Sequence, residues 1–104
     1  MKRFVLYAEL KPDKVEEYKE IHKNAWPEIL EIITKAHMHN YSISVIGNKV
    51  FTIYDYTGDD YDADMAEMEK YPVMQKWWSH TKPCFVHHED GWYYEDMEEV
   101  FYLK

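Results

Sequence analysis

The sequence is poor in cysteine and glycine and has no long apolar run: it contains one cysteine, three isolated glycines and four prolines. Cys84 has no second cysteine with which to form an internal disulfide, so nothing indicates secretion, and we expect a cytoplasmic protein. The apolar run 4–8 stops at Glu9, which is too short for a signal peptide or a membrane span. Isolated glycines also exclude a glycine-rich phosphate loop.

Basic residues are scarce as well. The chain has twelve Lys and Arg against twenty Asp and Glu, which gives a net charge of −8. Acidic and basic residues are equal in number in residues 1–40, so the acidic excess lies in residues 41–104. A protein that binds nucleic acid or an anionic membrane surface needs a basic patch, and the sequence has none. We therefore expect neither partner.

Aromatic residues are abundant, with ten Tyr, four Trp and four Phe in 104 residues. A chain of this length forms one domain, residues 1–104, and can bury one core. So many rings exceed what the core of a small domain needs, which suggests that some of them line a binding site.

The first half of the chain predicts a strand, a broken helix and a hairpin. The run 4–8 favours a strand, and Asp13 followed by Glu16 is a capping-box variant that would start a helix. Pro27 should break that helix near Trp26. Residues 41–45 and 50–56, joined by a turn at Gly47-Asn48, predict a β-hairpin.

The second half predicts helices capped at Asp59 and Asp60 and restarted at Pro72, a long ordered loop over 83–96 and a final strand over 100–103. The element order is β-α-β-β-α-β, an α+β fold of ferredoxin-like type. Helices on one face leave the other face of the sheet uncovered, and a second copy is the economical cover. We therefore expect a homodimer of the dimeric α/β-barrel type.

The first candidate for chemistry is His22, together with Tyr18. The two lie four residues apart, so on a helix they share one face, and that face is the apolar one. An imidazole in such a place titrates near neutral pH and can serve as a general acid or base. The alternative is a core histidine that is paired with a backbone carbonyl.

The second candidate is a set of rings that includes Tyr41 and the adjacent Trp77 and Trp78. Sugars stack their C–H faces on aromatic rings while their hydroxyls find polar partners, and rings with a polar edge serve both needs. Adjacent helical residues point about 100° apart, so one tryptophan could bind ligand while the other packs. The alternative is that these rings belong to the core or to a dimer interface.

The sequence offers little evidence for a metal site or for a catalytic cysteine. The pairs at His37 and His39 and at His87-His88 lack further ligands at the spacing that zinc sites require, so we expect no metal. Cys84 follows a proline and has no adjacent histidine, and we expect it to be structural. The acids of 59–64 lack the glycine and the later glutamate of a calcium loop.

Taken together, these residues resemble the L-rhamnose mutarotase family, and the resemblance runs from end to end with almost no shift in spacing. It is carried by Pro12-Asp13, Glu17-Tyr18, His22, Trp26-Pro27-Glu28, Asn40-Tyr41, Trp77-Trp78 and Glu99-Val100-Phe101-Tyr102-Leu103. Two features depart from the family pattern. Ile21 stands where a basic residue commonly precedes the histidine, and the stretch 80–92 is unusually rich in rings and imidazoles, so we expect Phe85 and Trp92 to extend the pocket.

The resemblance implies a dimeric ferredoxin-like protein that interconverts the α and β anomers of L-rhamnose without a cofactor. It implies that His22 is the proton donor and that Tyr18, Tyr41, Trp77 and Trp78 bind the sugar. L-Fucose or another 6-deoxy-hexose is an alternative substrate. Two other functions suit the same scaffold, because this fold hosts many activities: a cofactor-free or haem-handling monooxygenase, and a non-catalytic sugar-binding subunit.

Overall fold

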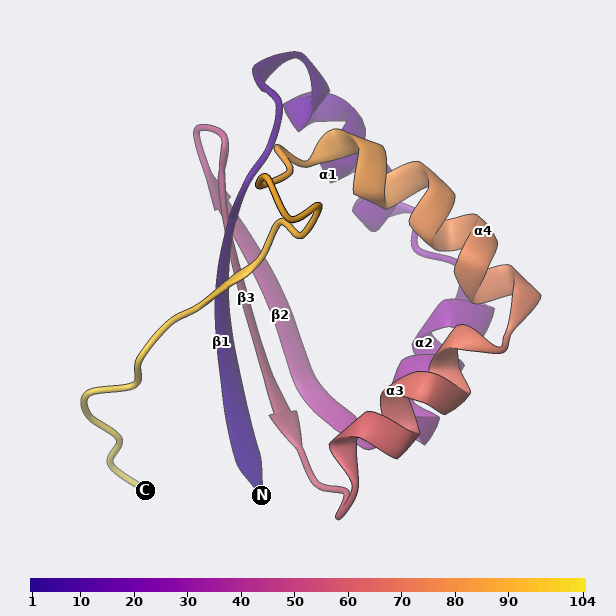
Figure 1. The fold of residues 1–104 in the computed structure, drawn as a ribbon, viewed down its shortest axis with the longest axis vertical. Coiled ribbons are helices and arrows are strands. Elements are labelled where there is room, and N and C mark those ends of the chain that lie inside the picture. The colour runs from indigo at the N-terminus through magenta and orange to yellow at the C-terminus, as the bar shows by residue number, and fades with distance from the viewer.

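The computed structural model describes residues 1–104 and shows one antiparallel sheet with helices on one side of it (Figure 1). The elements, in chain order, are β1 (Lys2–Glu9), a 3₁₀ turn (Pro12–Lys14), α1 (Val15–Lys23), α2 (Pro27–Lys35), β2 (Met38–Ile46), β3 (Lys49–Tyr56), α3 (Tyr61–Glu69), α4 (Pro72–Thr81), a second 3₁₀ turn (Lys82–Cys84) and β4 (Glu95–Asp96).

Proline and aspartate set most helix boundaries where the sequence predicts them. α1 ends at Lys23 and α2 begins at Pro27, which confirms the break, and α4 begins at Pro72. The side chain of Asp60 accepts a hydrogen bond from the backbone N–H of Ala63 and caps α3. The predicted cap at Asp13 is wrong. Residues 12–14 form a 3₁₀ turn, and α1 starts at Val15 without a side-chain cap, because the proline at position 12 already begins a tighter turn.

The sheet has the strand order β2-β3-β1-β4, and every neighbouring pair is antiparallel. β2 and β3 form the predicted hairpin, whose turn places Gly47 at a φ of +60°, a conformation that glycine adopts without strain. With two helices in each connection between β1 and β2 and between β3 and β4, this is the ferredoxin-like arrangement that the sequence predicts.

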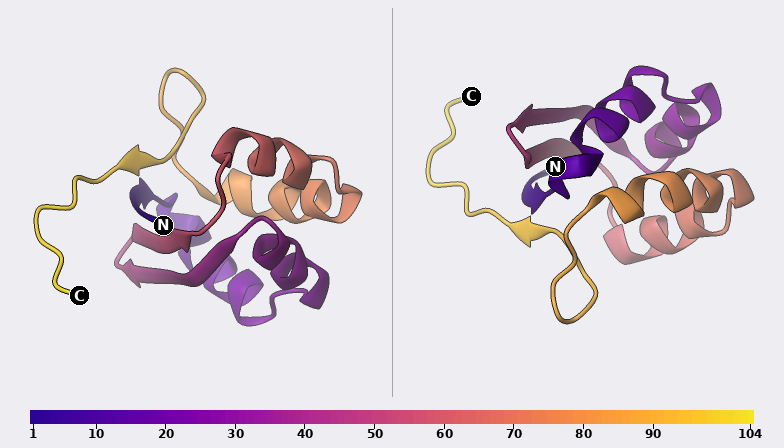
Figure 2. Two further views of the ribbon diagram at one scale, coloured as in Figure 1. Left: turned by 90° about the horizontal axis from the view of Figure 1, so that it is seen from below. Right: turned by 90° about the horizontal axis from the view of Figure 1, so that it is seen from above.

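The final strand lies earlier than predicted and is shorter. β4 comprises Glu95 and Asp96, paired with Tyr7 and Leu6, whereas residues 97–104 form no strand. They leave the body of the protein as an extended tail (Figures 1 and 2). The tail keeps one backbone contact with the β1 edge, from the Met97 N–H to the Val5 carbonyl, and no ladder of hydrogen bonds continues from there. Strand-favouring residues alone therefore do not make this segment a strand.

The two faces of the sheet differ in their cover. Alternation along β1 and β3 turns Leu6 and Tyr54 towards the helices and Tyr7 and Phe51 towards the uncovered face. On the helical side the buried side chains form two separate clusters rather than one. The first consists of Ile29, Ile32, Ala36, Met38, Tyr54, Met68, Met74 and Trp77, and the second of Ala8, Leu10, Tyr18, Val50, Cys84, Phe85 and Tyr93.

Candidate active site

A cavity of about 390 Å³ lies between the sheet and the helices α3 and α4. Its walls join the two core clusters, since Tyr54 and Met68 come from the first and Tyr93 from the second. Most of its lining is apolar or aromatic, with Asp62, Glu69 and Lys82 as the charged exceptions. The complete lining is Leu6, Met38, Tyr41, Tyr54, Tyr61, Asp62, Met65, Met68, Glu69, Trp78, Lys82, Trp92, Tyr93 and Tyr94.

Tyr41 enters this cavity because β2 is irregular at that point. The register of β2 against β3 shifts between His39 and Ser42, and Asn40 has a φ of +51°. The Asn40 side chain donates a hydrogen bond to Asp55 Oδ2 at 3.0 Å, which fixes the bulge. Tyr41 then stacks on Tyr54 with the ring centroids 5.0 Å apart and the planes nearly parallel. Tyr41 is 39% exposed as a whole, but desolvation of its hydroxyl raises its pKa, so the hydroxyl stays protonated and can donate a hydrogen bond.

The adjacent tryptophans have different surroundings. Trp78 lines the cavity, and the Lys82 ammonium lies 4.6 Å from the centroid of its ring. Trp77 is buried in the first core cluster and meets the rings of Trp26 and His22 edge to face. One of the two rings therefore faces the cavity, and the other packs in the core.

His22 is half-buried on α1, next to Tyr18 and Trp77. Its Nδ1 donates a hydrogen bond to the backbone carbonyl of Tyr18 at 2.9 Å, because a carbonyl oxygen can only accept. The neutral ring therefore keeps the lone pair of Nε2 free. Burial lowers the pKa of His22 below its ordinary 6.5, and the hydrogen bond to Tyr18 opposes that shift. The imidazole is thus neutral at pH 7, with one nitrogen able to accept a proton.

Tyr18 connects His22 with the cavity. Its ring centroid is 4.2 Å from that of His22 and 5.3 Å from that of Phe85. Desolvation raises the pKa of Tyr18, and the cavity-lining Tyr94 and Tyr41 are close enough to raise it further.

The residues singled out from the sequence therefore fall into two groups. Tyr41 and Trp78 line the cavity, whereas Tyr18, His22 and Trp77 are in mutual contact beside it and are not among its lining residues.

Sequence reasoning missed several tyrosines of the cavity. Tyr54 and Tyr61 share a hydrogen bond of 2.7 Å between their hydroxyls, and Tyr93 and Tyr94 enter from the loop before β4. The period-two alternation of β3 would have placed Tyr54 on the helical face. Trp92 extends the lining as expected, but Phe85 does not: it is 2% exposed and belongs to the second core cluster, where it stacks on Tyr93.

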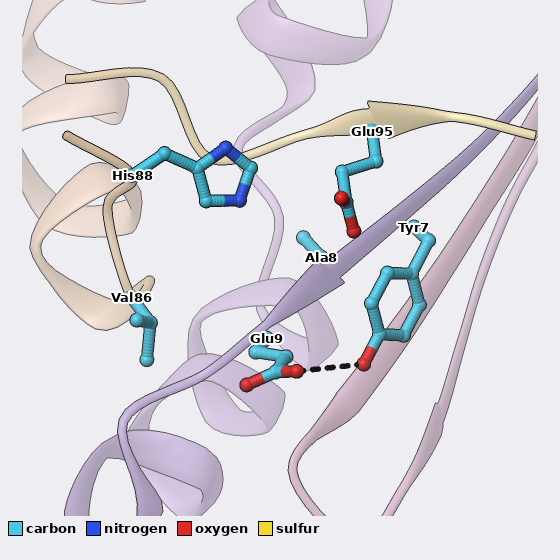
Figure 3. A pocket seen from close by; sticks show the side chains of 6 residues that line it. All are labelled: Tyr7, Ala8, Glu9, Val86, His88 and Glu95. Carbon is cyan, nitrogen blue, oxygen red and sulfur yellow. Dashed lines mark hydrogen bonds between the residues drawn. The ribbon is translucent and has the colours of Figure 1, made fainter. Parts of the chain in front are cut away.

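Further hollows lie elsewhere on the surface, among them one beside the loop that follows α4 and one beside α1. One, of about 220 Å³, is on the uncovered side of the sheet, where the Tyr7 hydroxyl donates to Glu9 Oε1 and where His88 and Glu95 also lie (Figure 3). The other, of about 360 Å³, is a groove beside α1 and α4 that includes Trp77 and His80. Neither contains Tyr41 or Trp78.

Other reactive groups are held in structural contacts. Cys84 is fully buried, its pKa is raised by burial, and it makes long contacts with Glu17 and the His80 carbonyl. No three His, Cys, Asp or Glu side chains come together as a metal site. None of the helices combines the length and the apolar character needed to cross a bilayer.

The protein is therefore a small α+β protein of the ferredoxin-like class, with an aromatic cavity and a neutral imidazole beside it. Comparison with known proteins narrows this class. The family model for L-rhamnose mutarotase matches residues 3–103. The chain belongs to the L-rhamnose mutarotase family.

Individual relatives agree with this assignment. An L-rhamnose mutarotase from Bacillus subtilis is 31% identical over 104 residues, which cover 99% of each chain. The crystal structure of an L-rhamnose mutarotase from Formosa agariphila has a TM-score of 0.78 at 23% identity, with both chains covered completely, and shows the same fold. A putative antibiotic biosynthesis monooxygenase from Nitrosomonas europaea shares the fold more distantly, with a TM-score of 0.60, 15% identity and coverage of 91% and 84% of the two chains.

Proposed function

We propose that this protein is a sugar mutarotase that interconverts the α and β anomers of a 6-deoxy-hexose, with L-rhamnose as the main substrate and L-fucose as an alternative. The observation that carries the proposal is the neutral His22, with Nε2 unpaired, beside a cavity lined by Tyr41 and Trp78. Membership of the L-rhamnose mutarotase family supports the same reaction.

The cavity suits a small deoxy-sugar. Its volume of about 390 Å³ lies within the range of about 300–1,000 Å³ that is typical of small-molecule sites. The rings of Trp78 and Tyr41 offer faces for the C–H groups of a pyranose, and their polar edges offer hydrogen bonds to its hydroxyls. The methyl group of a 6-deoxy-hexose can be buried against Met65 and Met68, where a hydroxymethyl group would lose its hydrogen bonds to water.

The mechanism follows from the state of His22. With the anomeric carbon of the sugar at the Tyr18 side of the cavity, within reach of His22, Nε2 accepts the proton of the anomeric hydroxyl, the electron pair of that O–H bond forms the C1=O1 double bond, and the C1–O5 pair moves onto the ring oxygen. The imidazolium then gives the same proton to the ring oxygen, so His22 is the proton donor of the second half-reaction. Both oxygens are bonded to C1, so one nitrogen can serve them in turn. Rotation about C1–C2 and the reverse steps produce the other anomer, without any external reactant.

The tyrosines contribute without ionising. Because burial raises the pKa of Tyr18 and of Tyr41, both hydroxyls stay protonated at neutral pH and donate hydrogen bonds that orient the sugar. Such donors also stabilise the negative charge that develops on oxygen in the transition state. Trp77 does not contact the sugar in this proposal; its ring packs edge to face with the His22 ring and fixes the orientation of the imidazole.

Proton NMR exchange spectroscopy tests the proposal, because it measures anomer interconversion at equilibrium. With the purified protein at pH 7, we expect exchange between the anomeric protons of L-rhamnose to be much faster than in buffer, and exchange in D-glucose to be accelerated far less. Binding of L-rhamnose without faster exchange would instead identify a sugar-binding subunit. A spectral change on titration with haem would favour a haem-handling monooxygenase.

We propose further that the protein acts as a homodimer in the cytoplasm. The tail carries large apolar side chains that nothing in the protomer covers, with Val100 86%, Phe101 79% and Leu103 80% exposed. The tail is anchored beside the uncovered face of the sheet, because the Met97 N–H donates to the Val5 carbonyl and the Arg3 guanidinium lies over the Tyr102 ring. A second copy that packs on this face would cover the sheet and the tail together.

A further inference from the structure

Thr52 has the one buried side-chain oxygen or nitrogen in the protein that lacks a hydrogen-bond partner. The residue is fully buried in the middle of β3, and its Oγ1 finds no donor or acceptor. It pairs with Leu6 on one side and Ile43 on the other, and Leu6 lines the cavity. Thr52 is therefore on the cavity side of the sheet. An unpaired buried hydroxyl costs free energy and calls for an explanation.

Tyr94 is a cavity-lining side chain close to Thr52. It lies one residue before β4, at the end of the loop that follows α4, and its ring contacts those of Phe85 and Tyr93. Tyr94 packs against the second core cluster, as does Ile43, the β2 partner of Thr52, and that cluster contains Val50, two residues before Thr52 on the same face of β3. The side chains of Tyr94 and Thr52 therefore lie on the same side of the sheet and close together, although no hydrogen bond joins Thr52 to a partner. Burial raises the pKa of the Tyr94 hydroxyl, and the nearby hydroxyls of Thr52 and Tyr18 oppose that shift.

These contacts form a path from the cavity to the histidine: Tyr94 lines the cavity and packs against the second core cluster, which contains Tyr18, and Tyr18 lies against His22. We propose that Tyr94 is a further substrate-contacting residue, whose hydroxyl donates a hydrogen bond to the ring oxygen of the sugar, and that Thr52 is the positioning residue that holds this hydroxyl. The inference rests on the proposed mutarotase function and adds a residue to that site.

The chemistry gives each hydroxyl a task. When the C1–O5 bond breaks, the electron pair moves onto the ring oxygen, and a donor aimed at that atom stabilises the transition state more than the bound sugar. A phenol that donates to the sugar has its oxygen lone pairs free, and one of them can accept a hydrogen bond from Thr52. The orphan hydroxyl of Thr52 then gains its partner when the sugar orients Tyr94. No proton is transferred from either hydroxyl, so nothing has to be regenerated.

Three variants and a control test the proposal through exchange rates measured over a range of L-rhamnose concentrations. Tyr94→Phe removes only the hydroxyl, and we expect kcat to fall about tenfold with little change in KM. Thr52→Val keeps the shape of the side chain, and we expect a fall in kcat of about threefold. In Tyr94→Phe/Thr52→Val we expect no loss beyond that of Tyr94→Phe, because Thr52 acts through the missing hydroxyl. The control Tyr71→Phe removes a phenol hydroxyl that lies outside the cavity lining, and we expect wild-type rates.

The results separate this assignment from the function itself. If wild type and Tyr71→Phe accelerate exchange and Tyr94→Phe keeps the full kcat, the assignment of Tyr94 is wrong and the mutarotase function stands. A second loss on adding Thr52→Val to Tyr94→Phe would show that Thr52 does not act through Tyr94. If wild type does not accelerate exchange at all, the function and the assignment are both overturned.

Discussion

The Nδ1 atom of His22 lies 2.9 Å from the backbone carbonyl oxygen of Tyr18, one turn earlier on α1. This contact fixes which ring nitrogen carries the proton and leaves Nε2 as an acceptor. A histidine satisfied by a backbone carbonyl was the structural alternative to a catalytic one. The geometry shows that the two are compatible, since the carbonyl occupies one nitrogen and the other remains for substrate.

The pH dependence of the reaction should follow the lowered pKa of His22. Only the neutral ring accepts the anomeric proton, so kcat should be lost as the pH falls through that pKa and should level off at higher pH. The midpoint should lie below 6.5, because burial disfavours the imidazolium. A rate profile of anomer exchange from pH 4.5 to 9 measures this. A midpoint above 6.5, or a rate that falls from pH 6.5 to 8, would contradict the assignment of His22 as the base.

Protonation of His22 should also weaken folding at acid pH. A histidine whose pKa is lower in the folded state than in the unfolded chain leaves the unfolded state with more bound protons, so this contribution to stability is lost as the pH falls below about 6.5. Urea unfolding at pH 5 and pH 7 should show a smaller difference for His22→Gln than for wild type. An equal difference in both proteins would mean that His22 does not take part in this linkage.

The adjacent tryptophans should separate stability from binding. Trp77 is 7% exposed and packed in the first core cluster, so Trp77→Ala should cost about 3–5 kcal/mol of the free energy of unfolding. Trp78 lines the cavity, so Trp78→Ala should mainly raise KM, by about 3- to 10-fold, in line with the about 0.5–1.5 kcal/mol of an aromatic contact. Urea unfolding and concentration-dependent exchange rates measure the two effects. If Trp77→Ala mainly raised KM and Trp78→Ala mainly lowered stability, the roles assigned to the two tryptophans would be wrong.

Thr52→Val should make the folded protein more stable while it slows the reaction. Replacing an unpaired buried hydroxyl with a methyl group removes a desolvation penalty, and we expect a gain of about 1 kcal/mol in the free energy of unfolding. Thr57→Val is the matched control, because the Thr57 hydroxyl donates to the His37 carbonyl, and we expect no gain there. If Thr52→Val lowers the free energy of unfolding, or changes it no more favourably than Thr57→Val does, the Thr52 hydroxyl is paired in solution.

The tail should hold the dimer together. Phe101→Asp places a charge on a side chain that is 79% exposed in the protomer, and we expect it to convert a dimer into the 12.7 kDa monomer. Leu30→Asp, at an exposed position of α2, should leave the dimer intact. Sedimentation equilibrium measures the mass of each protein. A monomeric wild type, or a dimer that is insensitive to Phe101→Asp, would contradict this arrangement.

The sequence predicts much of the fold because its signals are local. Pro27, Pro72 and Asp60 act within one helical turn, and the hairpin around Gly47 is fixed by alternation and by a turn residue. The predicted strand over 100–103 is wrong for a related reason. Phe101 and its neighbours favour a strand, but strand formation also depends on backbone pairing with another part of the sheet. Local pattern cannot show that pairing.

The candidate site was less predictable because it depends on contacts between distant segments. The position of Tyr41 depends on a bulge held by Asn40 and Asp55, and the entry of Tyr94 depends on the path of a loop. The contact between His22 and Tyr18 was predictable, because residues four apart on a helix lie on the same face. Thr52 and Tyr94 are 42 positions apart in the numbering, and their proximity depends on where the loop before β4 packs, which has no sequence signal.

The central claim is that this protein interconverts sugar anomers through His22. Proton exchange spectroscopy on L-rhamnose at pH 7 tests it most directly, with wild type, His22→Ala and the control His80→Ala, which changes an exposed histidine of α4. We expect fast exchange with wild type and His80→Ala, and a loss of about 10²–10⁴-fold with His22→Ala, the usual contribution of a general acid–base group. Exchange by His22→Ala at the wild-type rate, or no acceleration by the wild-type protein, would contradict it.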